Sequence, residues 1–210
     1  RERQQAALFW AKQREGLQSG FIQMDRFPFQ YVWRRPGLFV VVFDASSASV
    51  DSLQRQWIET ALNSPHRKPD DLCLVMGHLP LTAFSEGRAR AGECIADPER
   101  LADLLRRARV DLVISGHHHA WYPSESLGMR LLSLGAMGSG PRRIIGSGVI
   151  APPSLTILEW SRSSNLVTET TFDLNSLTPI ASETLPERVH ASGFAPANRR
   201  PTQWRRDPGN

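Results

Sequence analysis

Uninterrupted apolar runs of strand length recur along the first half of the chain. Residues 38–43 and 72–76 are apolar throughout, and residues 110–114 form a third short run around a single aspartate. Runs of this kind indicate strands of a sheet that is buried on both faces. Each is far shorter than the roughly 18 apolar residues of a membrane-spanning helix, so no membrane span is expected.

Amphipathic stretches lie before and between these runs. Residues 4–17 predict a surface helix, residues 52–62 predict a helix capped by Asp51, and a third helix begins after Asp97. Each helix places its apolar residues on one face, at spacings of three and four. The expected core faces are Leu53, Trp57, Ile58 and Ala61 in the second helix, and Leu101, Leu104, Leu105 and Ala108 in the third.

The run at 72–76, the third helix and the run at 110–114 form a strand–helix–strand unit. Such a unit joins parallel strands through a right-handed connection. The residues that follow the two strands therefore lie at the same carboxyl edge of the sheet, where open α/β sheets bind their ligands. His78 follows the first strand, and three consecutive histidines, 117–119, follow the second.

The flanking segments predict less regular structure. The alternation in residues 27–33 predicts a half-exposed strand, which Pro28 places at the edge of a sheet. After residue 174 the apolar pattern fades and five prolines follow. We therefore expect one folded portion at residues 1–174 and an extended Pro/Arg-rich tail at residues 175–210. Before that tail, short segments separated by Gly, Pro and Ser predict antiparallel strands at 130–134, 155–160 and 166–172.

Composition places the chain among ordinary soluble globular proteins. Of its 210 residues, 40% are apolar and 22% are charged, which excludes disorder throughout. Its two cysteines exclude a disulfide framework, leave one bridge open and do not fix the compartment. The formal charge of +4 stems partly from arginines of the tail. Nucleic-acid binding by that basic tail is a weaker interpretation than a tail that is simply solvated.

Four of the six histidines are placed at the ends of the two neighbouring strands. Imidazoles that converge from separate loops are the ligands that iron, zinc and manganese sites need. A lone His78 is more often a hydrogen-bonded histidine at a strand end, but three consecutive histidines at the same edge favour a metal site. In an extended segment His117 and His119 point to one side, so His118 is expected to face elsewhere.

Four short motifs occur in order along residues 38–140. Residues 75–81, Val-Met-Gly-His-Leu-Pro-Leu, contain the pattern H-x-P, and residues 115–121, Ser-Gly-His-His-His-Ala-Trp, contain G-H-x-H. Asp-Ala-Ser at 44–46, followed by Gln-Arg-Gln-Trp-Ile-Glu at 54–59, and the glycine-rich turn at 135–140 complete the series. Together they resemble the C-terminal half of calcineurin-like metallophosphoesterases, in the purple-acid-phosphatase-like branch.

The resemblance implies a fold, a cofactor and an activity. The fold is α/β, a β-sandwich flanked by helices in four αββα layers. The resemblance makes His78 and His117 ligands of one metal and His119 a ligand of the other, in a centre of two divalent or trivalent ions, Fe, Zn or Mn. Such phosphatases hydrolyse phosphoric mono- or diesters of small molecules by attack of a metal-bound hydroxide. Two cations about 3.5–4 Å apart stabilise both the attacking and the leaving oxygen.

The resemblance also implies ligands that do not occur before His78. The family's first half carries Asp-x-His, Gly-Asp and Gly-Asn-His motifs, which supply carboxylate and asparagine ligands and a catalytic histidine. Here Asp44 is interpreted as a strand-end cap and His66 as a solvated turn residue. We therefore expect a C-terminal portion of a longer phosphoesterase domain, lacking the N-terminal half and incomplete as an enzyme alone. No catalytic residue is assigned in it.

The alternative is a non-catalytic protein on the same scaffold, whose histidine cluster binds one metal or none and whose surface serves an interaction. Arg142 and Arg143 suit a substrate phosphate, but solvated arginines after a turn are the commoner case. Trp121 and Tyr122 suit the mouth of the site and the core equally. The sequence predicts neither a compartment nor an oligomeric state, and it names no particular substrate.

Overall fold

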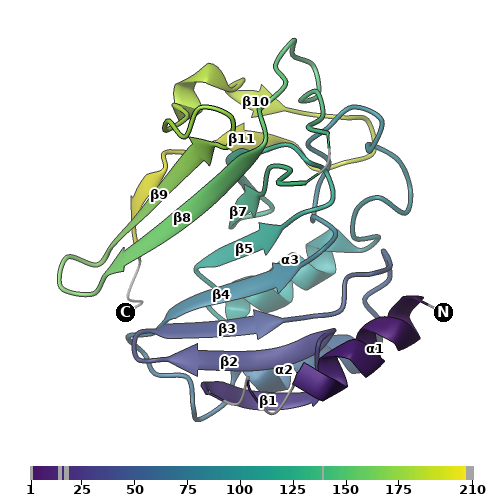
Figure 1. Ribbon diagram of the computed structural model, residues 1–210, viewed down its shortest axis with the longest axis vertical. Coiled ribbons are helices and arrows are strands. Elements are labelled where there is room, and N and C mark those ends of the chain that lie inside the picture. The colour runs from purple at the N-terminus through teal and green to yellow at the C-terminus, as the bar shows by residue number, and fades with distance from the viewer. Residues whose placement is uncertain (1, 14–15, 17–18, 139, 207–210) are drawn as a thin grey trace.

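Two β-sheets and three α-helices make up the computed structural model (Figure 1), which describes residues 2–13, 16, 19–138 and 140–206. Within these residues the large sheet has the strand order β1-β2-β3-β4-β5-β7-β6-β11-β10, and the small sheet has the order β12-β9-β8. The helices are α1 (Glu2–Gln13), α2 (Ser52–Leu62) and α3 (Pro98–Arg107), with a short 3-10 helix at Ser182–Thr184. The strands are β1 (Phe21–Arg26), β2 (Gln30–Arg35), β3 (Leu38–Val42), β4 (Leu72–Gly77), β5 (Leu112–Ser115), β6 (Tyr122–Ser126), β7 (Met129–Ser133), β8 (Ser154–Ser161), β9 (Leu166–Asp173), β10 (Arg188–Val189), β11 (Ala197–Arg199) and β12 (Gln203–Arg205).

The centre of the large sheet is parallel. β3 pairs with β4, β4 with β5, and β5 with β7, all in parallel register. α2 joins β3 to β4 and α3 joins β4 to β5, and both helices lie behind the sheet in Figure 1. The predicted strand–helix–strand unit is therefore confirmed. It places the carboxyl ends of β4 and β5 side by side, with Gly77 opposite Ser115.

α2 begins where the sequence predicts but presents a different core face. The side chain of Asp51 accepts a backbone hydrogen bond of 2.8 Å from the third residue after it, as a helix cap does. Ile58, Ala61 and Leu62 are buried, whereas Leu53 is 72% exposed. Leu53 precedes Ile58 by five positions, about 140° around a helix, so it faces away from the sheet. Its assignment to the core face was wrong.

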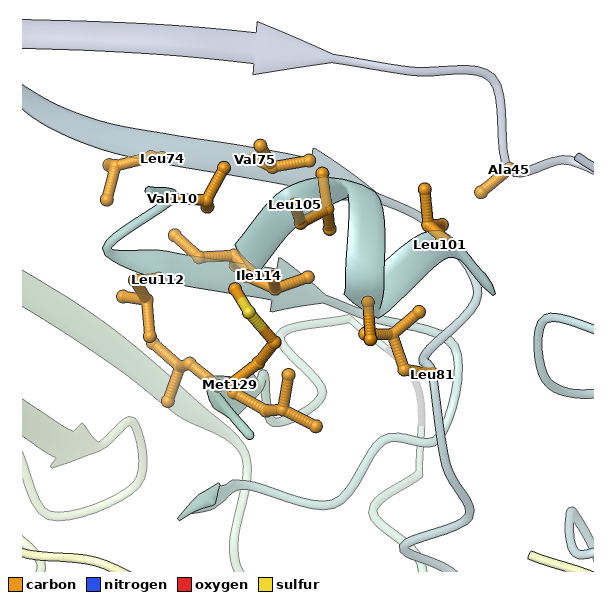
Figure 2. Close-up of a cluster of buried hydrophobic side chains, with 14 of the residues drawn as sticks. Ala45, Leu74, Val75, Leu81, Leu101, Leu105, Val110, Leu112, Ile114 and Met129 are labelled. Atoms are coloured by element: carbon orange, nitrogen blue, oxygen red, sulfur yellow. The ribbon is translucent and has the colours of Figure 1, made fainter. Parts of the chain in front are cut away.

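α3 packs on the sheet through its predicted leucine stripe. Leu101 and Leu105 are 1% and 0% exposed. Figure 2 shows both side chains within a cluster that includes Val75 of β4 and Ile114 of β5. This packing fixes the two strands whose ends carry the histidines.

Replacing Leu105 with alanine is expected to lower the free energy of unfolding by about 3 kcal/mol, because a fully buried leucine leaves a cavity in a packed core. The matched control is Leu53→Ala, also on a helix but 72% exposed, which should change it by less than about 0.5 kcal/mol. Urea unfolding followed by circular dichroism measures both. Equal midpoints for the two variants would contradict the packing described for α3.

Several peripheral strands differ from the sequence prediction. The strand expected at 27–33 is β2, which begins at Gln30 after a turn that holds Pro28 and lies between β1 and β3 rather than at an edge. β8 and β9 pair antiparallel, as predicted, and β7 pairs antiparallel with β6 but parallel with β5. α1 ends at Gln13, and residues 14, 15 and 17 of the helix expected there lie outside the described residues.

The C-terminal segment is folded into both sheets, which corrects the expectation of an extended tail at residues 175–210. β11 pairs with β6 and β10 extends the same sheet, while β12 pairs with β9. Residues 207–210 lie outside the described residues. The sequence did not predict these strands because each is only two or three residues long and lies in a Pro- and Arg-rich segment.

Arginines anchor the C-terminal segment inside the protein. Arg200 forms an ion pair of 2.7 Å with Glu169, with side chains 3% and 0% exposed. Arg206 forms one of 3.0 Å with Asp111, with side chains 8% and 7% exposed. These two positive charges are thus neutralised within the fold, which removes much of the reason to interpret the segment as a basic nucleic-acid-binding tail.

The structure shows whether the two cysteines form a disulfide and whether a described helix could span a membrane. Cys73 and Cys94 are both buried and free, so the bridge that the sequence left open is not formed. Burial raises the pKa of both thiols to about 12. Among the described residues, the helices are too short and too polar to cross a bilayer.

Candidate metal centre

The histidines emerge from the carboxyl edge of the parallel strands, as predicted. β4 ends at Gly77 and is followed directly by His78, while β5 ends at Ser115 and is followed by Gly116 and the histidines. The amide of Gly116 donates a hydrogen bond of 3.1 Å to the carbonyl of His78, which ties the two loops together. The register of β4 on β5 therefore sets the distance between the two histidine clusters.

His78 and His117 face each other through their ring nitrogens. Nε2 of His78 lies 3.0 Å from Nδ1 of His117. Two imidazole ligands of one ion, each at about 2.0–2.1 Å from it, have nitrogens about 3 Å apart when they are adjacent in the coordination sphere. Burial lowers the pKa of His78, and the nearby His117, His119 and Arg88 lower it further. These effects favour the neutral imidazole that a metal requires.

The backbone of the histidine segment is strained. His117 and His119 have φ angles of 63° and 50°, in the left-handed region that non-glycine residues seldom occupy. The extended conformation expected for this segment was therefore wrong. Such conformations persist where surrounding contacts impose them, and they concentrate at functional sites.

His119 turns toward the glycine-rich segment. Its Nδ1 lies 3.2 Å from the carbonyl oxygen of Gly140, which accepts a hydrogen bond. The amide of Arg142 in turn donates to the carbonyl of His119 at 3.0 Å. With the proton on Nδ1, the neutral ring carries its lone pair on Nε2. Ser139, within the predicted turn at 135–140, lies outside the described residues.

His118 is completely buried and has hydrogen-bond partners different from those of His117 and His119. Its Nδ1 accepts hydrogen bonds of 3.0 and 3.2 Å from the amides of Phe84 and Ser85, and its Nε2 lies 3.1 Å from the carbonyl oxygen of Glu93. Burial lowers the pKa of His118 to about 4. The neutral side chain therefore holds both ends of the 84–93 loop against the histidine segment by hydrogen bonds.

Glu93 is a site residue that the sequence analysis missed. Its Oε2 lies 2.6 Å from Nε2 of His117, and its carboxylate also pairs with Arg88 and Arg90. Hydrogen bonding from His117, then from Arg88 and Arg90, lowers the pKa of Glu93 to about 2. Its position in a polar, Arg-rich loop gave no indication that it would contact a histidine.

A cavity of about 340 Å³ adjoins His78 at the carboxyl edge. Its lining is mostly apolar, and Asp44 contributes a carboxylate to it. That carboxylate accepts hydrogen bonds from the amide and hydroxyl of Ser46, at 3.2 and 2.7 Å, and forms an ion pair with Arg3. Asp44 thus caps the turn after β3, as its position at a strand end indicated.

The aromatic candidates take structural positions, and Arg143 lies at the surface. Trp121 and Tyr122 are both 0% exposed, and the Tyr122 hydroxyl donates to the carbonyl of Pro186 at 2.8 Å. They belong to the core and not to the mouth of the site. Arg143 is exposed and lies 3.5 Å from a carboxylate oxygen of Glu86.

The donor set supplies part of a metal site. Imidazole nitrogens of His78 and His117 converge, and His119 follows His117 in the same loop. Across residues 2–13, 16, 19–138 and 140–206, no group of three or more His, Cys, Asp or Glu side chains forms a complete site. The described residues therefore offer imidazole ligands to a metal but no complete site.

Comparison with known proteins places this geometry in a family context. The model of the calcineurin-like phosphoesterase family matches residues 18–121. "Probable purple acid phosphatase 20" of Arabidopsis thaliana is 36% identical over 70 residues, which are 33% of this chain and 16% of that protein. Purple acid phosphatase 22 of the same plant is 37% identical over 71 residues, 34% of this chain and 16% of that protein. The matched segment is thus a small part of each phosphatase.

Solved structures share the fold. The purple acid phosphatase PPD1 from yellow lupin (Lupinus luteus) seeds has a TM-score of 0.61 at 14% identity, over 74% of this chain and 32% of that one. GAP50, the anchor in the inner membrane complex of Plasmodium, has a TM-score of 0.50 at 19% identity, over 69% and 47%. The mixed α/β architecture, with its large central sheet and flanking helices, is the purple acid phosphatase fold, which confirms the predicted fold class.

Proposed function

This chain belongs to the calcineurin-like phosphoesterase family, in its purple-acid-phosphatase-like branch, and from that premise we propose that it is part of a metal-dependent phosphoesterase. The reaction is hydrolysis of phosphoric mono- or diesters of small molecules. The observation that carries the proposal is the 3.0 Å approach of His78 Nε2 to His117 Nδ1 at the carboxyl edge of the parallel strands.

Three histidines would hold the metals in this proposal. His78 through Nε2 and His117 through Nδ1 bind one ion, and His119 binds the second. Iron, zinc and manganese all suit imidazole ligands. In this proposal the three histidines supply part of the ligand set, since the described residues hold no complete metal site.

When bound, the two metal ions supply Lewis acidity and a water of lowered pKa, which is the chemistry that phosphoester hydrolysis at neutral pH requires. The residues of this chain hold that chemistry in place. Partial desolvation, with His117, His119 and Arg88 nearby, lowers the pKa of His78 and favours its neutral ring. His117 lies against His78 and Glu93, whereas His119 lies against the carbonyl of Gly140. His118 keeps the 84–93 loop against them.

The test uses the full-length protein and the variants His117→Ala and His119→Ala. Each variant is expected to lose at least about tenfold in metal affinity, because each removes a direct ligand, and to lose turnover of a chromogenic phosphomonoester and phosphodiester. His66→Ala, an exposed histidine in a turn, is the matched control and should keep both. Full metal content and turnover in the two ligand variants would overturn the proposal.

A non-catalytic protein on the same scaffold is the second candidate. The similarity of fold to GAP50, an anchor in the inner membrane complex of Plasmodium, favours it, because the fold alone does not make a protein an enzyme. The same experiment separates the two. Metal binding that depends on His117 but comes with no turnover of either substrate supports the second candidate and contradicts the enzyme.

A further inference from the structure

The face of His117 that points away from His78 is occupied by a carboxylate. Nδ1 of His117 faces His78 at 3.0 Å, while Nε2 on the far side of the ring lies 2.6 Å from Oε2 of Glu93. We propose that Glu93 is a positioning residue that keeps the proton of His117 on Nε2, so that the lone pair of Nδ1 points at the metal. This inference rests on the metal site proposed above.

The distances at Nε2 decide between two protonation patterns. A neutral imidazole carries one proton, on one of its two nitrogens. Arg88 also lies near Nε2, at 3.3 Å, and a guanidinium only donates. If Nε2 accepted from Arg88, its lone pair would face a carboxylate oxygen at 2.6 Å, two acceptors in contact. The shorter contact therefore requires the proton on Nε2, donated to Glu93.

Glu93 is itself held from three directions. Its Oε1 accepts from Nε and an Nη of Arg90 at 3.1 and 2.9 Å, and its Oε2 pairs with Arg88. Its backbone carbonyl lies 3.1 Å from Nε2 of the buried His118. The arginines thus fix the carboxylate and His118 fixes the backbone. Carboxylates that accept from the second nitrogen of a metal-bound histidine orient the ring and raise its basicity.

The first arm of the test reads the proton directly. In the metal-free full-length protein, labelled with ¹⁵N at histidine, NMR should show the Nε2–H form of His117. In Glu93→Ala the carboxylate is gone and Arg88 can donate to Nε2, so the proton should move to Nδ1. In Glu93→Gln the amide oxygen still accepts from Nε2–H, so the wild-type form should remain. A merely structural residue would not move the proton.

The second arm measures zinc affinity by calorimetry. Glu93→Ala is expected to bind Zn²⁺ about 10–100-fold more weakly than the wild-type protein, with Glu93→Gln closer to wild type. The matched control is Glu86→Ala, in the same loop but exposed and facing Arg143, which should leave both readouts unchanged.

The two arms separate failure of this inference from failure of the proposed function. A wild-type protein that binds no Zn²⁺ contradicts the metal site, while the NMR arm still decides what Glu93 does to the ring. Retention of Nε2–H in Glu93→Ala overturns the positioning role, whatever the zinc result. Glu93→Gln behaving like Glu93→Ala in both arms would also overturn it, because the accepting oxygen would then not be the cause.

Discussion

Replacing Glu169 with alanine is expected to lower the free energy of unfolding by about 3–5 kcal/mol, because it leaves the buried guanidinium of Arg200 without its counter-ion. The loss extends to Trp204, whose ring N–H donates to the same carboxylate at 2.7 Å. Arg200 also donates to the carbonyls of Ser124 and Leu131 on the neighbouring strands, so the charge cannot move out to water without disturbing the sheet.

Two comparisons make the Glu169 experiment specific. Asp103→Ala removes one partner of an exposed pair, with side chains 58% and 55% exposed, and should cost less than about 1 kcal/mol. The double variant Glu169→Leu/Arg200→Met should be more stable than either single charge deletion, because it leaves no charge buried. Urea unfolding of the wild type, Glu169→Leu, Arg200→Met and the double variant gives the cycle. A Glu169→Ala midpoint equal to that of Asp103→Ala would show that the buried pair does not anchor the segment.

Replacing His118 with alanine is expected to cost about 4 kcal/mol of unfolding free energy. The change leaves the buried amides of Phe84 and Ser85 without an acceptor, at about 1–3 kcal/mol each, and opens a cavity where a fully buried ring was. Because the same ring holds the Glu93 carbonyl, the 84–93 loop should also become more open to proteolysis.

His118→Asn is the informative companion variant, since an asparagine side-chain oxygen can take the place of Nδ1 as acceptor. It should retain more stability than His118→Ala in thermal unfolding, and limited proteolysis should cut its 84–93 loop more slowly. If alanine and asparagine at this position are equivalent in both measurements, the two amide hydrogen bonds contribute nothing to stability, and His118 does not hold the 84–93 loop through them.

The parts of the fold that the sequence predicts are those where a single physical effect dominates. Apolar runs buried on both faces predict β3, β4 and β5, and the leucine spacing predicts α3, because burial alone decides those positions. The same reasoning brought His78 and the second histidine cluster to one edge. Leu53 shows the limit of this reasoning, since a leucine in the first turn of a helix can face solvent when the stripe begins further along.

The parts that the sequence did not reveal depend on pairs of polar residues far apart in the chain. The sequence around Arg200 and Arg206 predicts solvated side chains. In the fold both are buried, because each forms an ion pair with a buried carboxylate, Glu169 for Arg200 and Asp111 for Arg206. Glu93 likewise acquires its role from a contact with His117, 24 positions later. From its residue type alone, a charged residue is predicted to lie at the surface. A distant partner of opposite charge can instead bury it, and such a pair leaves no periodic pattern in the sequence.

The strand pairing at the C-terminal end has a consequence for how the protein is made. β6 is translated well before its neighbour β11, and Asp111 precedes its partner Arg206 by 95 residues. While the C-terminal residues are still being synthesised, the edge of β6 that pairs with β11 has no partner strand and Asp111 lacks its partner Arg206. An unpaired edge invites association with other chains. Closure of both sheets waits until β11 and β12 have been synthesised, and such long-range pairing is slower to form than local contacts.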